Sequence, residues 1–462
     1  MTASIRPVVV GAGPAGVRAA QTLVAAGLRP VVVDEAPAWG GQIYRQQPPG
    51  FTRPKRALYG FEVTRAKAVH AAMAAIRDRV DYRPHTLVWN AEGERLDLLS
   101  DGRAATLTYT HLILATGATD RVLPFPGWTT PGVYTLGGAQ VALKFQGCGI
   151  GRRVAFLGTG PLLYLVAYQY ARAGAAVAAV LDTAPFTAKL QAAPGMLRLP
   201  AVFAKGLWYL AWLKARGIPV RSGVRPLQVE GEARATGLLW REGTRERRVA
   251  CDAVAFGYGL RSETQLADLL GCRFAFDALD RAYLPVRDAA GRTSVPHVYV
   301  AGDGAGVMGA DAAERAGERA ALALLQDIGT AVDGARALHL ERELGRIQGF
   351  RRALERAFPV PADWAANVPD DLVICRCEEV RAGELRAATR EAGAREMNRL
   401  KALTRVGMGR CQGRMCGTAA AEILAQACDT APEAVGRLRG QPPVKPLPVA
   451  LARHVEPEEV GR

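Results

Sequence analysis

Four cysteines near the C-terminal end have the spacing of a metal centre. Cys375 and Cys377 form one pair, Cys411 and Cys416 form another, and the 33 residues between the pairs are patterned as two amphipathic helices. Paired cysteines in structural zinc sites usually leave about two to four residues between them, whereas one residue separates the first pair here. This spacing favours an iron-sulfur cluster over zinc, with free thiols as the remaining alternative.

Positive charge surrounds these cysteines, which suits a cluster of net negative charge. Cys416 also directly precedes a predicted helix whose first N–H groups can face the sulfur atoms. The arginines of this segment are Arg376, Arg405, Arg410 and Arg414. The other cysteines have no partner at ligand spacing, so we expect them to be small core residues: Cys148, Cys251, Cys272 and Cys428.

A glycine-rich turn near the N-terminal end has the form of a dinucleotide-binding loop. It begins at Gly11, after an apolar strand at 7–10, and Asp34 ends the next strand 23 residues later. Gly11 permits the tight turn, Gly13 lets the backbone approach a pyrophosphate, and Gly16 lets helix and strand pack closely. The residues expected to bind the dinucleotide here are Gly11, Gly13, Pro14, Ala15 and Gly16, with Asp34 or Glu35 on the adenosine ribose.

The surroundings of this turn favour FAD over NAD. A glycine pair follows the acid, where an FAD domain typically wraps the pyrophosphate and the flavin. Two later strands, at 112–114 and 298–300, run straight into glycine-bearing turns, and the second turn should precede a helix that begins near Gly306 and points its positive end toward the flavin. The residues expected to contact FAD in these segments are Gly41, Gln42, Arg45, Thr116, Gly117, Gly302 and Asp303.

A second strand, turn, helix and strand follow at 153–182, so the chain repeats a dinucleotide-binding half. Leu163 stands where the third glycine of the fingerprint belongs, and Asp182 ends the second strand. The larger side chain holds the helix further from the strand. This unit therefore binds NAD(P)H poorly, binds a different adenine nucleotide, or is a structural relic.

The repeat implies an α/β protein in which one Rossmann-type domain is inserted into another, with a small helical module after them. The predicted divisions are an FAD-binding domain at 1–125 and 290–330, a second dinucleotide-binding-like domain at 126–289, a helical connector at 331–365, a 2Fe-2S-binding domain at 366–430, and an extended Pro-rich tail at 431–462.

Several classes of function are disfavoured. The formal charge of +15 comes from arginines scattered over every segment rather than gathered in one stripe, which argues against nucleic-acid binding. Neither dinucleotide unit contains a Cys-x-x-Cys dithiol, and the six dispersed histidines offer no obvious base, so catalytic residues stay unknown. The sequence shows neither the pattern of a secretory signal nor that of a transmembrane segment, so we expect a cytoplasmic protein.

Several segments together resemble the FAD-containing alpha chain of bacterial heteromeric amine and amino-acid dehydrogenases. The segments are GAGPAG, DEAPAWGGQIYR, LILATGATDRVLPFPGW, GVYTLGGAQVALKFQG, GTGPLL, ICRCEEV and TRVGMGRCQGRMCG. That group includes the FAD-containing chains of opine oxidase, of hydrogen cyanide synthase and of the proline and hydroxyproline dehydrogenases. The resemblance implies a thioredoxin-reductase-like fold and a module like bacterioferritin-associated ferredoxin, with a 2Fe-2S cluster on the four cysteines.

The same resemblance implies partners. Substrate oxidation is expected on a flavoprotein beta subunit, with a small third subunit, an FMN at the subunit junction and a respiratory acceptor at the inner membrane in some complexes. We therefore hypothesise an electron-transferring subunit with FAD and 2Fe-2S. The alternatives are a self-sufficient NAD(P)H-dependent reductase and a non-catalytic, zinc-bearing scaffold. The sequence names neither the amine, the terminal acceptor nor the subunit stoichiometry.

Overall fold

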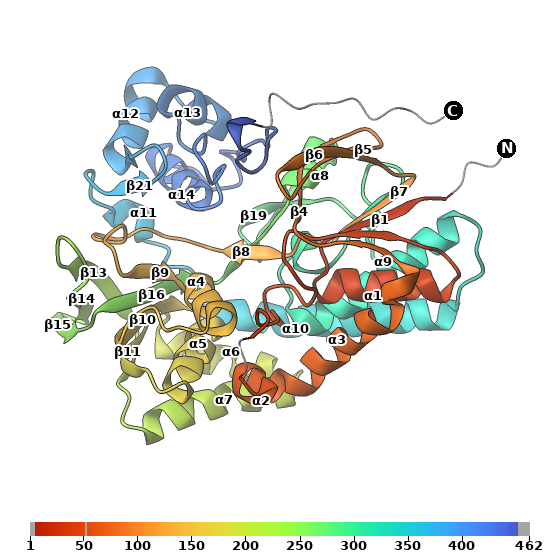
Figure 1. Ribbon diagram of the computed structural model, residues 1–462. Helices are drawn as coiled ribbons and strands as arrows, with labels where there is room; N and C mark the ends of the chain where they lie inside the picture. The colour runs from red at the N-terminus through yellow and green to blue at the C-terminus, as the bar shows by residue number, and fades with distance from the viewer. Residues whose placement is uncertain (1–4, 51–52, 451–462) are drawn as a thin grey trace.

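The computed structural model describes residues 5–50 and 53–450 and contains two parallel sheets, each flanked by helices (Figure 1). The expected strands at 7–10 and 31–33 lie side by side in the first sheet, and the strand at 298–300 joins it at one edge. In order across the sheet the strands are β20 (Val298–Val300), β7 (His111–Leu114), β1 (Pro7–Val10), β2 (Val31–Val33) and β3 (Asp81–Arg83).

The two faces of the first sheet pack against different layers, because successive strand side chains point to opposite sides. Val9 and Val32 face the helices, whereas Val8 and Val10 face an antiparallel meander. Because both faces of the sheet are covered, its strands can consist of nearly continuous valine runs. The helices are α1 (Pro14–Ala25), α3 (Val63–Ile76) and α9 (Ala310–Asp327), and the meander strands are β4 (Thr86–Glu92), β5 (Arg95–Ser100) and β6 (Arg103–Thr108).

The second sheet repeats this plan between residues 133 and 258. Phe156 faces α5 (Pro161–Arg172), and Leu157 faces an antiparallel meander on the other side. Across the sheet the strands are β12 (Val220–Ser222), β11 (Ala176–Asp182), β10 (Arg153–Thr159), β16 (Ala253–Tyr258) and β9 (Val133–Thr135). The meander strands are β13 (Val224–Glu230), β14 (Gly237–Glu242) and β15 (Arg245–Ala250), and the remaining helices of this part are α4 (Leu136–Val141), α6 (Phe186–Met196) and α7 (Pro200–Ala215). The next helix, α8 (Gln265–Leu269), packs against the meander of the first sheet.

A short antiparallel ribbon joins the parts that carry the two sheets. It pairs β8 (Ala118–Asp120) with β17 (Leu260–Ser262), and Figure 1 shows β8 between the two parts. β8 directly follows Thr116 and Gly117. The crossing chain therefore passes beside the predicted flavin site.

The cysteine segment folds as a compact helical unit that shares a hydrophobic core with the second sheet. Phe256 of β16 and Ile423 of α14 belong to one buried cluster, and the Trp128 indole N–H donates to the Val373 carbonyl. The elements are α11 (Trp364–Asn367), β21 (Val373–Cys375), β22 (Val380–Arg381), α12 (Ala382–Ala392), α13 (Met397–Thr404) and α14 (Gly417–Ala427). The long helix before the unit, α10 (Gly334–Ala357), packs against α6 and α9 instead. The two helices expected between the cysteine pairs are α12 and α13.

Two local expectations need adjustment. The helix expected near Gly306 begins at Ala310, because Gly302–Ala305 form a 3₁₀ turn first. The described part of the tail, 431–450, contains no helix or strand but lies against the body, where Arg437 pairs with Asp268. The rest of the predicted tail, 451–462, lies outside the described residues.

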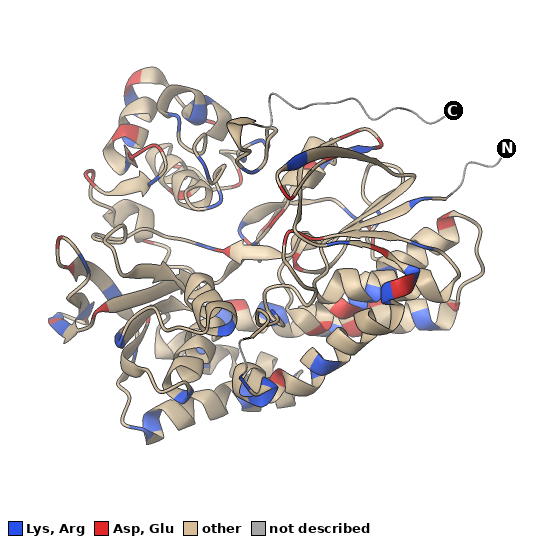
Figure 2. Ribbon diagram, viewed as in Figure 1, with Lys and Arg blue, Asp and Glu red and all other residues tan. Residues whose placement is uncertain are grey.

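The chain carries a formal net charge of +15. Figure 2 shows Lys and Arg on helices of both parts, on the β13–β15 meander and on the cysteine unit. Among the described residues, none of the helices has the length and apolarity needed to cross a bilayer.

Candidate flavin and iron-sulfur sites

The N-terminal glycine turn is tightly packed between β1 and α1. Gly11 has a φ of +102°, and a Cβ there would lie 2.3 Å from the Ala115 carbonyl oxygen. A Cβ on Gly16 would lie 1.7 Å from the Gly11 carbonyl oxygen. Gly13 is the N-cap of α1 and no side chain caps the helix, so first-turn N–H groups are free to bind a phosphate.

The other predicted flavin segments converge on this turn. The Gly40 N–H donates to the Ala12 carbonyl at 2.8 Å, and a Cβ on Gly41 would lie 2.9 Å from the Gly13 Cα. A Cβ on Gly302 would lie 2.9 Å from the Ala15 Cβ. Similarly, a Cβ on Gly304 would lie 2.7 Å from the Thr116 hydroxyl, which places the turns after β7 and β20 side by side.

The two acids expected on the adenosine ribose have different surroundings. The Asp34 carboxylate accepts hydrogen bonds from the backbone N–H groups of Ala12 and Ala36, and burial raises its pKa. It therefore fixes the glycine turn. Glu35 is half exposed and pairs with Lys445 of the tail.

Asp303 fixes the start of α9. Its Oδ1 accepts the backbone N–H groups of Met308 and Gly309, each at 2.9 Å, and burial raises its pKa. The carboxylate thereby holds the two residues that directly precede α9 in a tight turn. Its backbone carbonyl also accepts the Ser262 hydroxyl at 2.6 Å, which links this turn to the residues that follow β17.

Gln42 and Arg45 face each other within their loop. An Arg45 Nη donates to the Gln42 side-chain carbonyl at 2.7 Å, and the guanidinium lies 5.3 Å from the centre of the Phe145 ring. Among the described residues, the buried Arg45 Nε finds no acceptor. Because buried donors are rarely left unpaired, this orphaned group fits a polar cofactor at the loop.

Lys144 is a buried residue close to the predicted flavin loops, and none of the sequence motifs includes it. It lies in the π-helical segment Ala142–Gln146, its Nζ donates to the Ile43 carbonyl at 3.0 Å, and burial lowers its pKa to about 7. π-Helical turns often occur at functional sites. The signal in the sequence was a single lysine inside the apolar run at 141–145, which by itself is ambiguous.

The four predicted cysteine ligands meet in the folded chain. Cys416 is hydrogen-bonded to both Cys375 and Cys411, and Cys377 to Cys411. The bond with Cys416 lowers the pKa of Cys375 to about 6 and that of Cys411 to about 5. The same bonds raise the pKa of Cys416, and burial raises that of Cys377.

In residues 5–50 and 53–450, no three or more His, Cys, Asp or Glu side chains are grouped as ligands of one metal ion. Four cysteine thiols are the donor set that a 2Fe-2S cluster takes.

The charges around the cysteines are more balanced than the sequence suggested. Arg405 pairs with Glu378 at 2.8 Å, and Arg414 pairs with Glu263 at 2.6 Å. The helix expected after Cys416 is α14, and Cys416 is its N-cap. The helix N-terminus therefore lies beside the sulfurs as expected.

One segment contacts both candidate sites. The Glu263 N–H donates to the Gly117 carbonyl at 2.9 Å, and its own carbonyl accepts the Thr116 hydroxyl at 2.6 Å. Its side chain holds Arg414 of the cysteine loop. Sequence motifs gave no sign of this role, because Glu263 lies in neither fingerprint.

The acid that ends the second strand of the second Rossmann-type domain is bound by neighbouring side chains. Asp182, at the end of β11, is fully buried and accepts the hydroxyls of Thr159 and Tyr164 at 2.8 and 2.6 Å. Lys189 pairs with the same carboxylate at 2.6 Å. Leu163, in place of the third glycine, is also fully buried.

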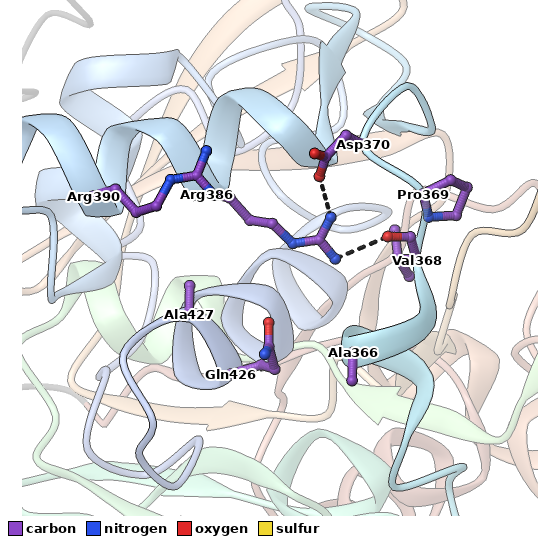
Figure 3. Close-up of a pocket in the computed structure, with 8 residues that line it drawn as sticks. All are labelled: Ala366, Val368, Pro369, Asp370, Arg386, Arg390, Gln426 and Ala427. Atoms are coloured by element: carbon purple, nitrogen blue, oxygen red, sulfur yellow. Dashed lines mark hydrogen bonds and ion pairs between the residues drawn. The ribbon is translucent and has the colours of Figure 1, made fainter.

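A pocket of about 510 Å³ lies elsewhere, on the outer side of the cysteine unit. Figure 3 shows Arg386 turned toward Asp370 and the Val368 carbonyl, with Gln426 on the facing helix. None of the predicted site residues lines it. We therefore place the chemistry at the glycine turns and the cysteines.

Residues 5–317 match the model of the pyridine nucleotide-disulphide oxidoreductases. The chain belongs to this family. Residues 373–426, which hold all four clustered cysteines, match the BFD-like 2Fe-2S binding domain. The chain is therefore an FAD-dependent oxidoreductase with a domain of the 2Fe-2S-binding type, as predicted. The match to a 2Fe-2S binding domain favours an iron-sulfur cluster over zinc at these cysteines.

Relatives are similar over nearly the whole chain. The A component of the opine oxidase of Rhizobium meliloti is 38% identical, over 95% of this chain and 85% of its own. The HcnB component of the hydrogen cyanide synthase of Pseudomonas aeruginosa is 35% identical, over 98% of this chain and 100% of its own. These matches confirm the predicted resemblance.

The fold is also found in a solved structure. The crystal structure of L-proline dehydrogenase from P. horikoshii superposes with a TM-score of 0.70 at 20% identity, over 97% of this chain and 79% of the other. The predicted fold class, two dinucleotide-binding domains with a small helical 2Fe-2S-type domain, is confirmed.

Proposed function

We propose that this chain is the electron-transferring alpha subunit of a heteromeric flavin-dependent dehydrogenase or oxidase. Its substrate would be an amine or amino acid of the opine, proline, hydroxyproline or glycine class, oxidised on a flavoprotein beta subunit. The cofactor-binding residues are those named for FAD in the first domain, and Cys375, Cys377, Cys411 and Cys416 hold the 2Fe-2S cluster. FAD would accept electron pairs, and the cluster would accept electrons singly.

The observation that carries this proposal is the contact of one segment with both sites. Glu263 touches the Thr116–Gly117 turn through its backbone and the cysteine loop through its side chain. An arrangement of this kind suits electron transfer within one chain. The relatives from R. meliloti and P. aeruginosa are both named as subunits of larger enzymes, which supports a partner chain.

In the second domain, the carboxylate of Asp182 already has side-chain partners, which supports this function over a self-sufficient NAD(P)H reductase. A Rossmann-type domain uses the acid after its second strand to bind the ribose, but Lys189 and Tyr164 already occupy Asp182. We expect anaerobic stopped-flow mixing of the isolated chain with NADH or NADPH to leave the flavin absorbance unchanged over seconds. Rapid bleaching would instead establish the reductase.

The assignment to a heteromeric complex is tested by comparing the chain alone with its complex. The chain would be purified anaerobically, assayed for flavin, iron and sulfide, and mixed with octopine, proline, hydroxyproline and glycine. We expect none of them to bleach the isolated chain and one of them to reduce it once a co-purifying flavoprotein is present. Oxidation by the chain alone, or a preparation without flavin and iron, would overturn the proposal.

Further parts of the complex follow only from the family resemblance. A small third subunit, an FMN at the subunit junction and a respiratory acceptor belong to the proposal as parts of the assembled enzyme, peripheral to the inner membrane. Cofactor extraction from the complex, followed by chromatography, distinguishes FMN from FAD.

A further inference from the structure

Residues 261–265 form a connection between the flavin turns and the cysteine loop, defined here as the junction segment. Its backbone and small side chains contact the flavin turns: Glu263 bonds the Thr116–Gly117 turn, and the Ser262 hydroxyl donates to the Asp303 carbonyl at 2.6 Å. The segment begins in β17, which pairs with β8 immediately after Gly117. It is therefore held against the Thr116–Gly117 turn through its main chain and against the Asp303 turn through the Ser262 hydroxyl.

Three longer side chains of the same segment point the other way, to the loop that carries Cys411 and Cys416. The half-buried Arg261 donates to the carbonyls of Gly413 and Arg414 at 3.1 and 3.2 Å. Gln265 donates to the Gln412 carbonyl at 2.8 Å. Three consecutive carbonyls of the cysteine loop thus bind to the junction segment.

Glu263 completes the connection with a two-point ion pair. Its carboxylate accepts Nε and Nη2 of Arg414 at 2.6 and 3.2 Å, and both side chains are largely buried, with exposed fractions of 14% and 13%. Arg414 also donates to the Cys411 carbonyl. Arginine-carboxylate forks of this kind fix orientation as well as distance.

We propose that Arg261, Glu263 and Gln265 are positioning residues that fix the cluster-binding loop against the flavin turns, so that electrons pass between the two cofactors within one chain. This inference rests on the proposed function. In each transfer the reduced flavin loses one electron, and one ferric iron of the cluster gains it to become ferrous. The residues themselves carry no electron.

The test uses Glu263→Gln in the full chain with both cofactors loaded. Flavin is reduced photochemically with 5-deazariboflavin and EDTA as the electron donor, and the cluster absorbance is followed in time. Removing the carboxylate leaves Arg414 uncompensated, so the midpoint potential of the cluster should rise, because net charge and hydrogen bonding set it. A higher potential alone would speed transfer to the cluster.

The expected result is nevertheless slower transfer, by about 10-fold or more, the usual loss when an outer partner of a metal site is removed. Slowing combined with a raised potential identifies a positioning role. The matched control is Glu422→Gln, which breaks the pair between Glu422 of α14 and Arg281, also two-pointed and also joining the cysteine unit to the body. That pair touches neither the cysteine loop nor the flavin turns, so both readouts should stay at wild-type values.

Unchanged or faster transfer in Glu263→Gln would overturn the inference, as would equal slowing in both variants. Arg261→Lys gives a second measurement if Glu263→Gln fails to fold, since it keeps the charge but loses the fork to Gly413 and Arg414. A wild-type chain without flavin or iron would instead refute the proposed function itself.

Discussion

Gly13 and Gly16 lie three residues apart in one turn, but an added methyl group would meet different surroundings. At Gly16 it would overlap the Gly11 carbonyl, whereas at Gly13 its nearest neighbour is the Gly41 Cα at 3.7 Å, an ordinary contact. Gly16 is therefore required by the protein itself. At Gly13 the chain itself has room for a side chain, so the glycine suits the phosphate that we propose binds there.

We expect Gly13→Ala to fold normally and lose FAD, and Gly16→Ala to be strongly destabilised. The second change forces α1 away from β1, at a cost of several kcal/mol of the roughly 5–15 kcal/mol typical of a domain. Flavin content and the thermal midpoint of the FAD-free protein measure the two effects. Gly206→Ala is the control, because its added methyl meets nothing within 4 Å in α7. A flavin-loaded Gly13→Ala protein would contradict the assignment.

Among the elements, the described tail shows how irregular chain is fixed by ion pairs. Asp268 of α8 is 4% exposed and accepts both Nη atoms of Arg437 at 2.6 and 2.7 Å. Burial raises the pKa of Asp268, but the bonds from Arg437 and the Gly440 N–H outweigh it, so the net pKa is lowered. The pair therefore stabilises the folded form above the pKa of a free aspartate, about 3.9, and is lost as pH falls below it.

Asp268→Asn should release the tail at pH 7 and cost about 1–3 kcal/mol, since the neutral amide cannot replace the charged acceptor. Faster tryptic cleavage at Arg437 and Arg439, read by mass spectrometry, measures the release. In urea unfolding, the difference from wild type should shrink as pH is lowered through about 4 to 3. A difference independent of pH would show that the charge is not responsible.

At the scale of the whole molecule, the cysteine unit and the second sheet share one core, while the FAD turns are built on the first sheet. Trp128, Phe256 and Ile423 are buried in the same cluster. The junction segment contacts both the turns of the first sheet and the cysteine loop. The two sites therefore depend on one folded structure, but different residues bind the two cofactors in our proposal.

Cys411→Ser should remove the cluster absorbance and most of the iron while FAD stays bound, because no FAD-contacting turn uses a cysteine. Visible spectra, with iron and flavin determined on the same sample, test this. Cys148→Ser is the control, since Cys148 is exposed and far from ligand spacing. Loss of flavin in Cys411→Ser would mean that the two sites depend on each other.

The sequence alone determined the local elements and the cofactor classes. Glycines at fixed offsets between a strand and a helix, and four cysteines at characteristic spacing, have few physical alternatives. The strands at 7–10 and 31–33 and the helices α12 and α13 were found from hydrophobic periodicity. The helix near Gly306 was misplaced by four residues, because a 3₁₀ turn and the bonds from Met308 and Gly309 to Asp303 come first, and periodicity does not register them.

Only the tertiary structure decided what lies between the sites. Glu263 and Arg414 are 151 positions apart in the sequence. Asp182, at the end of β11, forms an ion pair with Lys189 of α6. Lys144 likewise gains its role from a carbonyl about a hundred residues away. Such contacts depend on how distant segments pack, and no local pattern encodes them, whereas a glycine turn or a cysteine pair carries its chemical requirement within a few residues.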